Sequence, residues 1–380
     1  MTFLDARCAL LLGAALSTAA FVPPVQAAQY RVLHHFNGSD GSYANGNLQF
    51  DSAGNLYGTT PLGGSFNHGT IYELTRSGQF STVHSFSGGI DGADPGAGLT
   101  RDRATGDLYG TTTGGGAFHV GGIFKLTPDG TVVVLHDFNP DTEGDQPDGA
   151  LTLDGQGNLY GTTYQDGPNA IGTVFELAAN GEFRVLHAFG AVGSPEGGNP
   201  IGRLERHRDN FYGVTTSGGA GTGSSIFKVT SDGAFTMVYN PFTEGFEGAP
   251  ARDKSGNFYG AYTSGADDEV YVLNRKGEFS PLYSFNGTTD GRFPVGDMLL
   301  TKRGVLYGAT ARGGPNGDNG TIYKLTLEGK FTLLHGLAGP PNDGTEPSGG
   351  LVRGPGGKLY GTAIYGGRYG DGIIFSVSDK

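Results

Sequence analysis

Short apolar runs, each bounded by Gly, Asp or Pro, follow one another along most of the chain. One group of four reads GAGLTRD (96–102), GDLYGTT (106–112), GGIFKLT (121–127) and TVVVLHDF (131–138). The runs are rich in Val, Ile, Phe, Tyr and Thr, which favours strands, and none has a sustained helical period. Polar segments such as TPDG (127–130) predict hairpin turns between them. We therefore predict groups of four antiparallel strands.

The second strand of this group recurs seven times. Its first copy is GNLYGTT at 54–60. The Tyr of the seven copies falls at 57, 109, 160, 212, 259, 307 and 360, at intervals of 47 to 53 residues. A period near 50 with four strands per unit is typical of kelch-type propeller blades. The 71 Gly among 380 residues then indicate many tight turns rather than disorder. We expect Gly58 and its equivalents, in mid-strand, to leave room for an aromatic ring from the next blade.

The two ends of the chain each hold part of one four-stranded unit. A fourth strand, YRVLHHF (30–36), comes first without three strands before it, and the chain ends after a third strand, GIIFSVSDK (372–380). Pairing the first strand with the last completes one blade and leaves no open sheet edge. The predicted fold is therefore all-β: a seven-bladed β-propeller with four antiparallel strands per blade, closed by the N-terminal strand.

The repeated phrases LHxF, DGxxP, GNLYGTT, GG and GTIFKLTPDG resemble the GloVer tandem-repeat family of secreted bacterial proteins. The resemblance covers nearly the whole chain after the N-terminal segment. The fourth and fifth units depart most, with Tyr239 and Tyr283 in place of the strand His and SGADDE (264–269) in place of a Gly-rich loop. The resemblance implies a fold and an exported location, and it supplies no catalytic residues.

The first 27 residues are typical of a signal peptide. Arg7 precedes an apolar run from Cys8 to Val22, and Val25-Gln26-Ala27 offers a small-residue cleavage site. We expect cleavage to leave residues 28–380 as one propeller domain, secreted to the periplasm or the extracellular space. The mature chain would have no transmembrane segment and no cysteine, which excludes disulfides, thiol catalysis and cysteine metal sites.

The charge pattern argues against nucleic acid as a partner. The formal net charge is −12, and the densest basic stretch is ERHRD (205–209). Sister repeats have polar turns at this position, so we interpret the stretch as a solvated turn.

Strand alternation places the two tight hairpins of each blade on one face and the two longer connections on the other. We expect binding residues among the longer connections, since loops that vary carry function more often than hairpins do. Carboxylates lead the links between blades and are expected to cap their own turns: Asp91, Glu143, Glu196, Asp290 and Asp343. Outer-strand histidines recur once per blade, at His34 or His35, His84, His136, His187 and His335, so they cannot converge, and we interpret them as inter-blade packing residues.

The candidate ligand-binding residues are the loop residues that break the repeat. They are His68, His119, Tyr164, Arg292, Arg312, Tyr365, Arg368, Tyr369, Asp267, Asp268 and Glu269. Aromatic, arginine and carboxylate side chains together suit recognition of a glycan. No G-x-S-x-G, H-E-x-x-H or P-loop motif is present. The stretch 137–148 loosely resembles a calcium loop but has Thr142 at its sixth position and Asp148 at its twelfth, so we predict no cofactor, with Ca²⁺ as the alternative.

Three functional hypotheses follow. In the first, a monomeric, non-catalytic propeller binds a glycan or an envelope or extracellular protein partner through the long-loop face. In the second, the same face is the site of a polysaccharide lyase or glycoside hydrolase, with His119 or a Tyr as base and Arg292, Arg312 or Arg368 neutralising a uronate. In the third, the propeller is a structural or adhesive scaffold.

Overall fold

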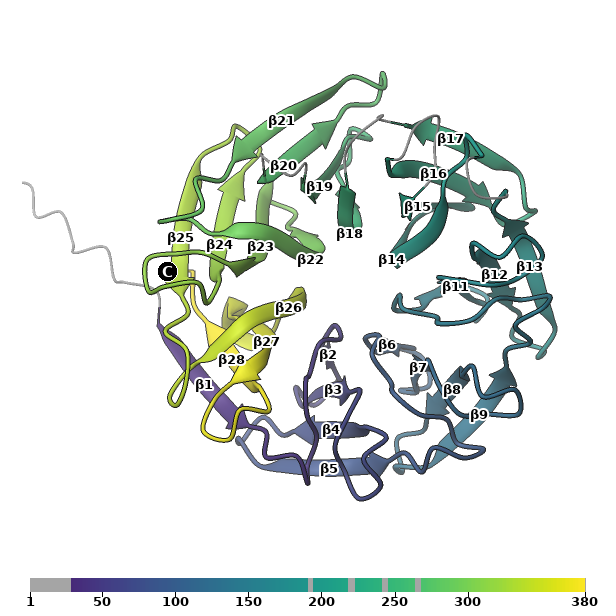
Figure 1. The fold of residues 1–380 in the computed structure, drawn as a ribbon, viewed down its shortest axis with the longest axis horizontal. Coiled ribbons are helices and arrows are strands. Elements are labelled where there is room, and N and C mark those ends of the chain that lie inside the picture. The colour runs from purple at the N-terminus through teal and green to yellow at the C-terminus, as the bar shows by residue number, and fades with distance from the viewer. Residues whose placement is uncertain (1–28, 191–193, 218–222, 241–244, 264–267, 380) are drawn as a thin grey trace, which may run out of the picture.

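The computed structural model describes residues 29–379 apart from 191–193, 218–222, 241–244 and 264–267; the predicted signal peptide lies outside these residues. Seven four-stranded antiparallel sheets are arranged around one axis, as Figure 1 shows in a view along that axis. The seven-bladed propeller predicted from the sequence is confirmed. Among the described residues, no helix is long and apolar enough to cross a membrane.

The strands are given blade by blade, from the innermost outwards. Blade 1 has β2 (Gln49–Phe50), β3 (Leu56–Thr60), β4 (Thr70–Leu74) and β5 (Phe80–Ser85); blade 2 has β6 (Thr100–Arg101), β7 (Leu108–Thr112), β8 (Gly122–Leu126) and β9 (Val132–Asp137). Blade 3 has β10 (Thr152–Leu153), β11 (Leu159–Thr163), β12 (Thr173–Leu177) and β13 (Phe183–Ala188); blade 4 has β14 (Gly198–His207), β15 (Asn210–Ser217), β16 (Ser225–Thr230) and β17 (Phe235–Tyr239). Blade 5 has β18 (Gly245–Arg252), β19 (Phe258–Thr263), β20 (Asp268–Leu273) and β21 (Phe279–Ser284); blade 6 has β22 (Arg292–Leu300), β23 (Val305–Arg312), β24 (Thr321–Thr326) and β25 (Phe331–Gly336). Blade 7 has β26 (Gly344–Arg353), β27 (Leu359–Gly366), β28 (Ile373–Val377) and β1 (Tyr30–His35), with a short 3₁₀ turn η1 (Pro355–Gly357) after β26.

The N-terminal strand closes the ring as predicted. β1 pairs antiparallel with β28, with Tyr30 opposite Val377 and His35 opposite Ile373. In Figure 1 the purple β1 lies along the outer edge of the yellow blade. The Tyr30 hydroxyl also donates a hydrogen bond of 2.6 Å to Asp343, in the link that leads into the same blade. The first and last strands of the chain therefore join the ring through backbone and side-chain contacts.

The hydrophobic core lies between the blades rather than within them. Each of the seven buried clusters combines residues of two neighbouring blades. In one of them Phe36, from the N-terminal segment, and Ile374 of blade 7 pack with Leu56 and Tyr72 of blade 1, and all four are at most 2% exposed. This explains why the strands are apolar on both sides of the pleat.

The mid-strand glycines make room for an aromatic ring, but one from a different place than expected. A Cβ atom on Gly161 would lie 2.5 Å from Cζ of Phe175, and Phe175 is its pairing partner on the adjacent strand β12 of the same blade. Gly58 has the same relation to Tyr72. The expectation of a ring from the next blade was wrong, because the aromatic side chain crosses its own sheet over the glycine.

Glycines also allow neighbouring inner segments to approach closely. In six of the seven inner segments a Gly approaches the backbone of the next blade, and in blade 2 the equivalent residue is Ala97; the glycines are Gly46, Gly149, Gly202, Gly248, Gly296 and Gly349. A Cβ atom on Gly149 would lie 2.1 Å from the carbonyl oxygen of Gly202. Adjacent inner segments can therefore pack backbone to backbone around the axis.

Candidate functional site

The connections on the two faces of the propeller are fixed by different kinds of contact. On the hairpin face, side chains join the two hairpins of a blade; for example, the Arg76 backbone N–H donates to Asn55 Oδ1 at 3.1 Å. On the long-loop face, backbone bonds join the loops of blades 1, 2, 3, 6 and 7 to the links before them: Gly64 N–H donates to the Gly38 carbonyl at 2.9 Å, and Gly116 N–H donates to the Gly89 carbonyl at 2.8 Å. In these five blades the loop is therefore fixed to the link before it.

The carboxylates of the links are held by their own turns and by the outer strand. Asp91, for example, accepts a bond of 3.0 Å from the Ser87 backbone N–H and lies 3.1 Å from His84 Nε2. The corresponding side-chain pairs are His34–Asp40 at 3.0 Å, His136–Glu143 at 2.8 Å, His187–Glu196 at 2.9 Å, Tyr283–Asp290 at 2.7 Å and His335–Asp343 at 2.9 Å. Burial of the Asp343 carboxyl works toward a higher pKa, but hydrogen bonds from His335 and Tyr30 outweigh it and hold the pKa below its usual range.

The outer-strand histidines pack between blades, as the sequence predicted. His34 stacks on Phe80 of the next blade with ring centroids 3.6 Å apart, and His136 stacks on Phe183 at 4.0 Å. His335 stacks on Tyr30 at 3.6 Å, so the same contact is made across the closure of the ring. Burial lowers the pKa of His187, which stacks in the same way on Phe235. These rings are occupied in packing and are not available as a converging site.

The loops of blades 7, 1 and 2 present an aromatic crescent, by which we mean Tyr365, Tyr369, Phe66 and Phe118. Tyr369 and Phe66 are 58% exposed and Phe118 is 50% exposed, all in loops between the second and third strands. Three sequence-predicted candidates lie beside these rings and are exposed: His68, His119 and Arg368. In the link between blades 1 and 2, Ile90 is 88% exposed. The aromatic crescent and the three residues beside it therefore include five of the eleven candidates, on three consecutive blades.

A second group of candidates lies across blades 5, 6 and 7 and is paired internally. Arg292 donates to Asp318 at 3.0 Å, while Arg312 lies 3.6 Å from the same carboxylate and donates to Glu346 at 2.9 Å. Asp268 accepts a bond of 2.8 Å from the backbone N–H of Phe293. Both arginines are thus already neutralised by carboxylates of neighbouring loops, which weakens the case for them as uronate-binding groups.

The remaining candidates have separate surroundings. Glu269 is 8% exposed and accepts hydrogen bonds from Tyr262 and, at 2.6 Å, from Ser284. Tyr164 is half-buried, and its carbonyl accepts a bond of 2.9 Å from Asn199. Asp267 lies outside the described residues. The structure therefore separates the described candidates into a crescent, an ion-paired cluster and isolated positions, and none of them lines the axial cavity.

The axial cavity is the feature that sequence reasoning missed. It has a volume of about 860 Å³ and is lined by inner strands together with first-hairpin residues, such as Asp102, Arg103 and Gly155, so its mouth is on the hairpin face. Arg206 and Arg208 of the ERHRD stretch line it. Arg208 and Asp209 form the exposed turn that the sequence predicted, whereas Arg206 lies on β14. Four arginines occupy one equivalent position at the end of the inner strand, and two of them, Arg101 and Arg206, line the cavity; the other two are Arg252 and Arg353.

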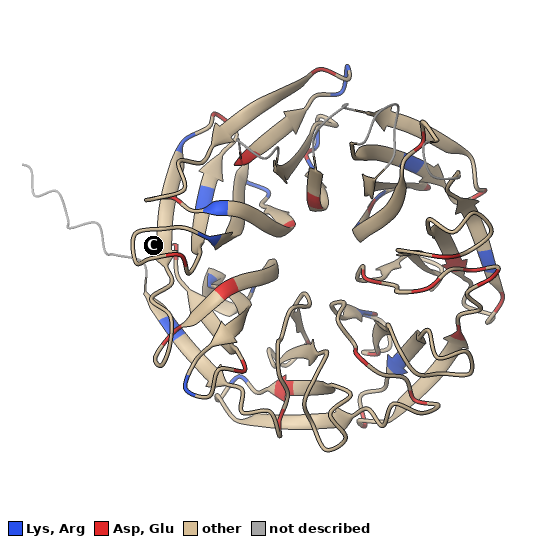
Figure 2. Cartoon of the chain, in the orientation of Figure 1, with Lys and Arg blue, Asp and Glu red and all other residues tan. Residues whose placement is uncertain are grey.

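Neither sign of charge dominates the rest of the ring. Figure 2 shows basic and acidic residues interspersed around the ring. Within the described part of the chain, no group of three or more His, Cys, Asp or Glu residues is arranged to hold a metal ion.

Two solved structures of similar fold are lyases by their titles. A streptogramin B lyase matches with a TM-score of 0.60 and 16% identity, over 92% of this chain and 97% of that one. A catalytically inactive variant of virginiamycin B lyase from Staphylococcus aureus, solved with quinupristin, matches with a TM-score of 0.63 and 15% identity, over 92% and 99% of the two chains. At this identity the likeness concerns the fold alone. No curated protein matches the chain.

The family model described as the Gloeobacter/Verrucomicrobia repeat matches residues 19–196 and 247–380. The unmatched segment 197–246 contains all four strands of blade 4, one of the two units that depart most from the repeated phrases. Since the match covers most of the sequence, the chain belongs to the Gloeobacter/Verrucomicrobia repeat family.

Proposed function

We propose that this protein is a non-catalytic carbohydrate-binding propeller and that the aromatic crescent of blades 7, 1 and 2 is its binding surface. The observation that carries the proposal is the exposure of Phe66, Phe118 and Tyr369 at one equivalent loop position of three consecutive blades. Large exposed rings leave much of their apolar surface in water in the isolated fold, whereas flat aromatic faces stack on the apolar faces of sugars.

Blades 3 and 6 show what this loop position holds when it serves the fold. There the equivalent residues are Asn169 and Asn316, and each side chain donates a hydrogen bond back to the end of its outer strand, at 2.7 Å to Phe189 and 2.6 Å to Gly336. The crescent replaces this internal bond with an exposed ring. The replacement gives up a local stabilising contact, as expected where a surface is used for binding.

The side chains beside the rings can supply the polar part of recognition. His68, His119 and Arg368 are exposed, and the backbone N–H of Arg368 is fixed by His35 Nδ1 at 3.2 Å. Sugar recognition needs hydrogen-bonding groups next to the stacking surface to orient the hydroxyls. In this proposal the mature protein is a monomeric domain of residues 28–380, exported to the periplasm or the extracellular space, where polysaccharides are accessible.

The test is a pull-down of the purified mature protein on a panel of insoluble and immobilised polysaccharides. We expect binding to at least one of them, reduced at least tenfold in a triple variant Phe66→Ala, Phe118→Ala and Tyr369→Ala. Val133→Ala is the matched control, because Val133 is 40% exposed on β9, away from the loops. Absence of binding across the panel, or equal binding by the triple variant, would contradict the proposal. Release of new reducing ends or of unsaturated products would instead support the lyase or hydrolase alternative.

A further inference from the structure

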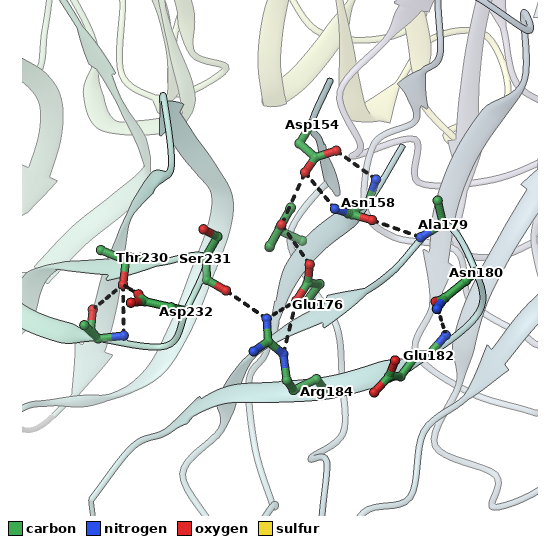
Figure 3. A network of polar contacts seen from close by, with 12 residues as sticks. Asp154, Asn158, Glu176, Ala179, Asn180, Glu182, Arg184, Thr230, Ser231 and Asp232 are labelled. Carbon is green, nitrogen blue, oxygen red and sulfur yellow. Dashed lines mark hydrogen bonds and ion pairs between the residues drawn. The ribbon is translucent and has the colours of Figure 1, made fainter. Parts of the chain in front are cut away.

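The four carboxylates that line the axial cavity already have partners. Asp154 accepts from Asn158, Gln156 and Tyr160, within the polar network drawn in Figure 3. Asp297 accepts 2.7 Å from Asn47 Nδ2 and 2.8 Å from the Ala249 N–H. Asp102 accepts from the Ala104 N–H at 2.7 Å, and Glu205 lies 3.6 Å from Arg203. Burial also raises the pKa of Glu205.

The arginines of the same cavity are not paired in this way. Five line it, and only Arg203 forms ion pairs with described residues, at 3.6 Å from Glu205 and 3.7 Å from Asp297. The other four form no ion pair within the described ranges: Arg101, Arg103, Arg206 and Arg208. Two come from blade 2 and two from blade 4, so unpaired positive charge meets the cavity from two directions.

A second observation concerns single buried atoms. The Nε atoms of Arg101 and Arg206 are buried without a hydrogen-bond partner. Arg252, at the equivalent position of blade 5, has the same buried Nε but does not line the cavity, so this feature belongs to the repeated position, and the case for a ligand rests on the unpaired charge.

We propose that the hairpin-side mouth of the axial cavity binds a small ligand carrying two oxyanion groups, one held by Arg101 and Arg103 and the other by Arg206 and Arg208. Guanidinium groups bind carboxylate, phosphate and sulfate with paired hydrogen bonds, and they remain charged at every physiological pH. A volume of about 860 Å³ is within the range of small-molecule sites. The site lies on the face opposite the aromatic crescent and does not depend on it.

Isothermal titration of the mature protein with trigalacturonate and with pyrophosphate separates the two sources of such a ligand, and maltotriose is the neutral probe. We expect at least one of the anions to bind, with an affinity that falls as NaCl is raised. The double variant Arg206→Gln/Arg208→Gln should weaken binding at least tenfold, as should Arg101→Gln/Arg103→Gln. Arg275→Gln is the matched control, because Arg275 is exposed on another hairpin of the same face and does not line the cavity.

The crescent variant Phe66→Ala/Phe118→Ala/Tyr369→Ala should bind the anion unchanged, which separates this site from the proposed polysaccharide surface. Melting temperatures of the arginine variants equal to wild type would show that folding is intact. Two Arg pairs are tested separately so that a folding defect in one does not decide the result. Failure of both anions to bind, equal binding of maltotriose, or unchanged affinity in a folded Arg variant would overturn the proposal.

Discussion

The closure of the ring by β1 leads to a strong prediction about truncation. A chain that begins at Gly38 lacks β1 and leaves β28 with an unpaired edge, because the pairs from Tyr30–Val377 to His35–Ile373 are lost. We expect this chain to be aggregated or markedly destabilised, whereas a chain that begins at Ala28 should fold normally. Exposed strand edges are templates for pairing with other chains, so aggregation is the expected form of failure.

The size of the effect follows from the contacts removed. Phe36 is fully buried, and burying such a side chain is worth roughly 1.5–3 kcal/mol. The Tyr30 hydroxyl donates to the Asp343 carboxylate, and hydrogen bonds to charged groups contribute about 1.5–3 kcal/mol. Tyr30 and Val32 also pack on the core between blades 6 and 7. Together these losses are comparable with the lower half of a typical unfolding free energy of about 5–15 kcal/mol.

Thermal unfolding followed by circular dichroism, together with size-exclusion chromatography, measures both outcomes. A synthetic peptide of residues 28–37 added in excess should raise the melting temperature of the chain that begins at Gly38, because it can restore the missing strand. The reasoning is refuted if the truncated chain is monodisperse and melts at the full-length temperature. A peptide that binds without any stabilising effect would also show that β1 is not what holds the ring closed.

Two further predictions concern the axis and the buried tyrosines. Gly149→Ala should lower the free energy of unfolding by about 1–3 kcal/mol in denaturant unfolding, because its Cβ would overlap the backbone of blade 4. Gly155→Ala is the control and should be neutral or slightly stabilising, because no atom lies within 4 Å of the added Cβ. Equal effects of the two substitutions would contradict the close approach of inner segments. Burial raises the pKa of Tyr72 and Tyr323 in the folded chain above the usual value near 10. As pH rises, these hydroxyls therefore lose their protons in the unfolded chain before they do so in the folded chain. The stability present below about pH 10 should decline as pH rises above that value. Tyrosinate absorbance should rise together with unfolding, and it can be read without interference because the chain has no Trp. Tyr72→Phe should reduce the loss of stability at high pH. Ionisation of all tyrosines near pH 10 with the fold intact would be inconsistent with their burial.

The fold could be predicted from the sequence because every blade repeats the same local pattern. The interval between successive LYG phrases and the unmatched strand at each end together determine both the number of blades and their closure. The sequence could not predict which ring covers Gly58, because an aromatic residue on the adjacent strand and one in the next blade satisfy the same pattern. Only the register, which places Tyr72 opposite Gly58, distinguishes them.

The sites were less accessible to sequence reasoning because they depend on which loops become neighbours. His68, His119 and Tyr369 could be selected as departures from the repeat, but Phe66 and Phe118 could be recognised only once the loops were superposed and their exposure was known. The cavity arginines were missed for a different reason. Arg206 and Arg208 were assigned to a solvated turn by comparison with the polar turns of sister repeats, and that comparison does not reveal that the first hairpins border the axial cavity.

The location of the cores between blades has a consequence for how such chains change over evolution. No blade has a core of its own, so an isolated four-stranded unit would expose both apolar faces of its sheet and could not persist as a small ancestral domain. A unit gained or lost by recombination must bring both of its surfaces into register with existing neighbours. Strong similarity between units satisfies this requirement automatically, since any copy then fits beside any other. The near-identical phrases of the chain are therefore what allows a ring of this kind to grow by duplication and still close.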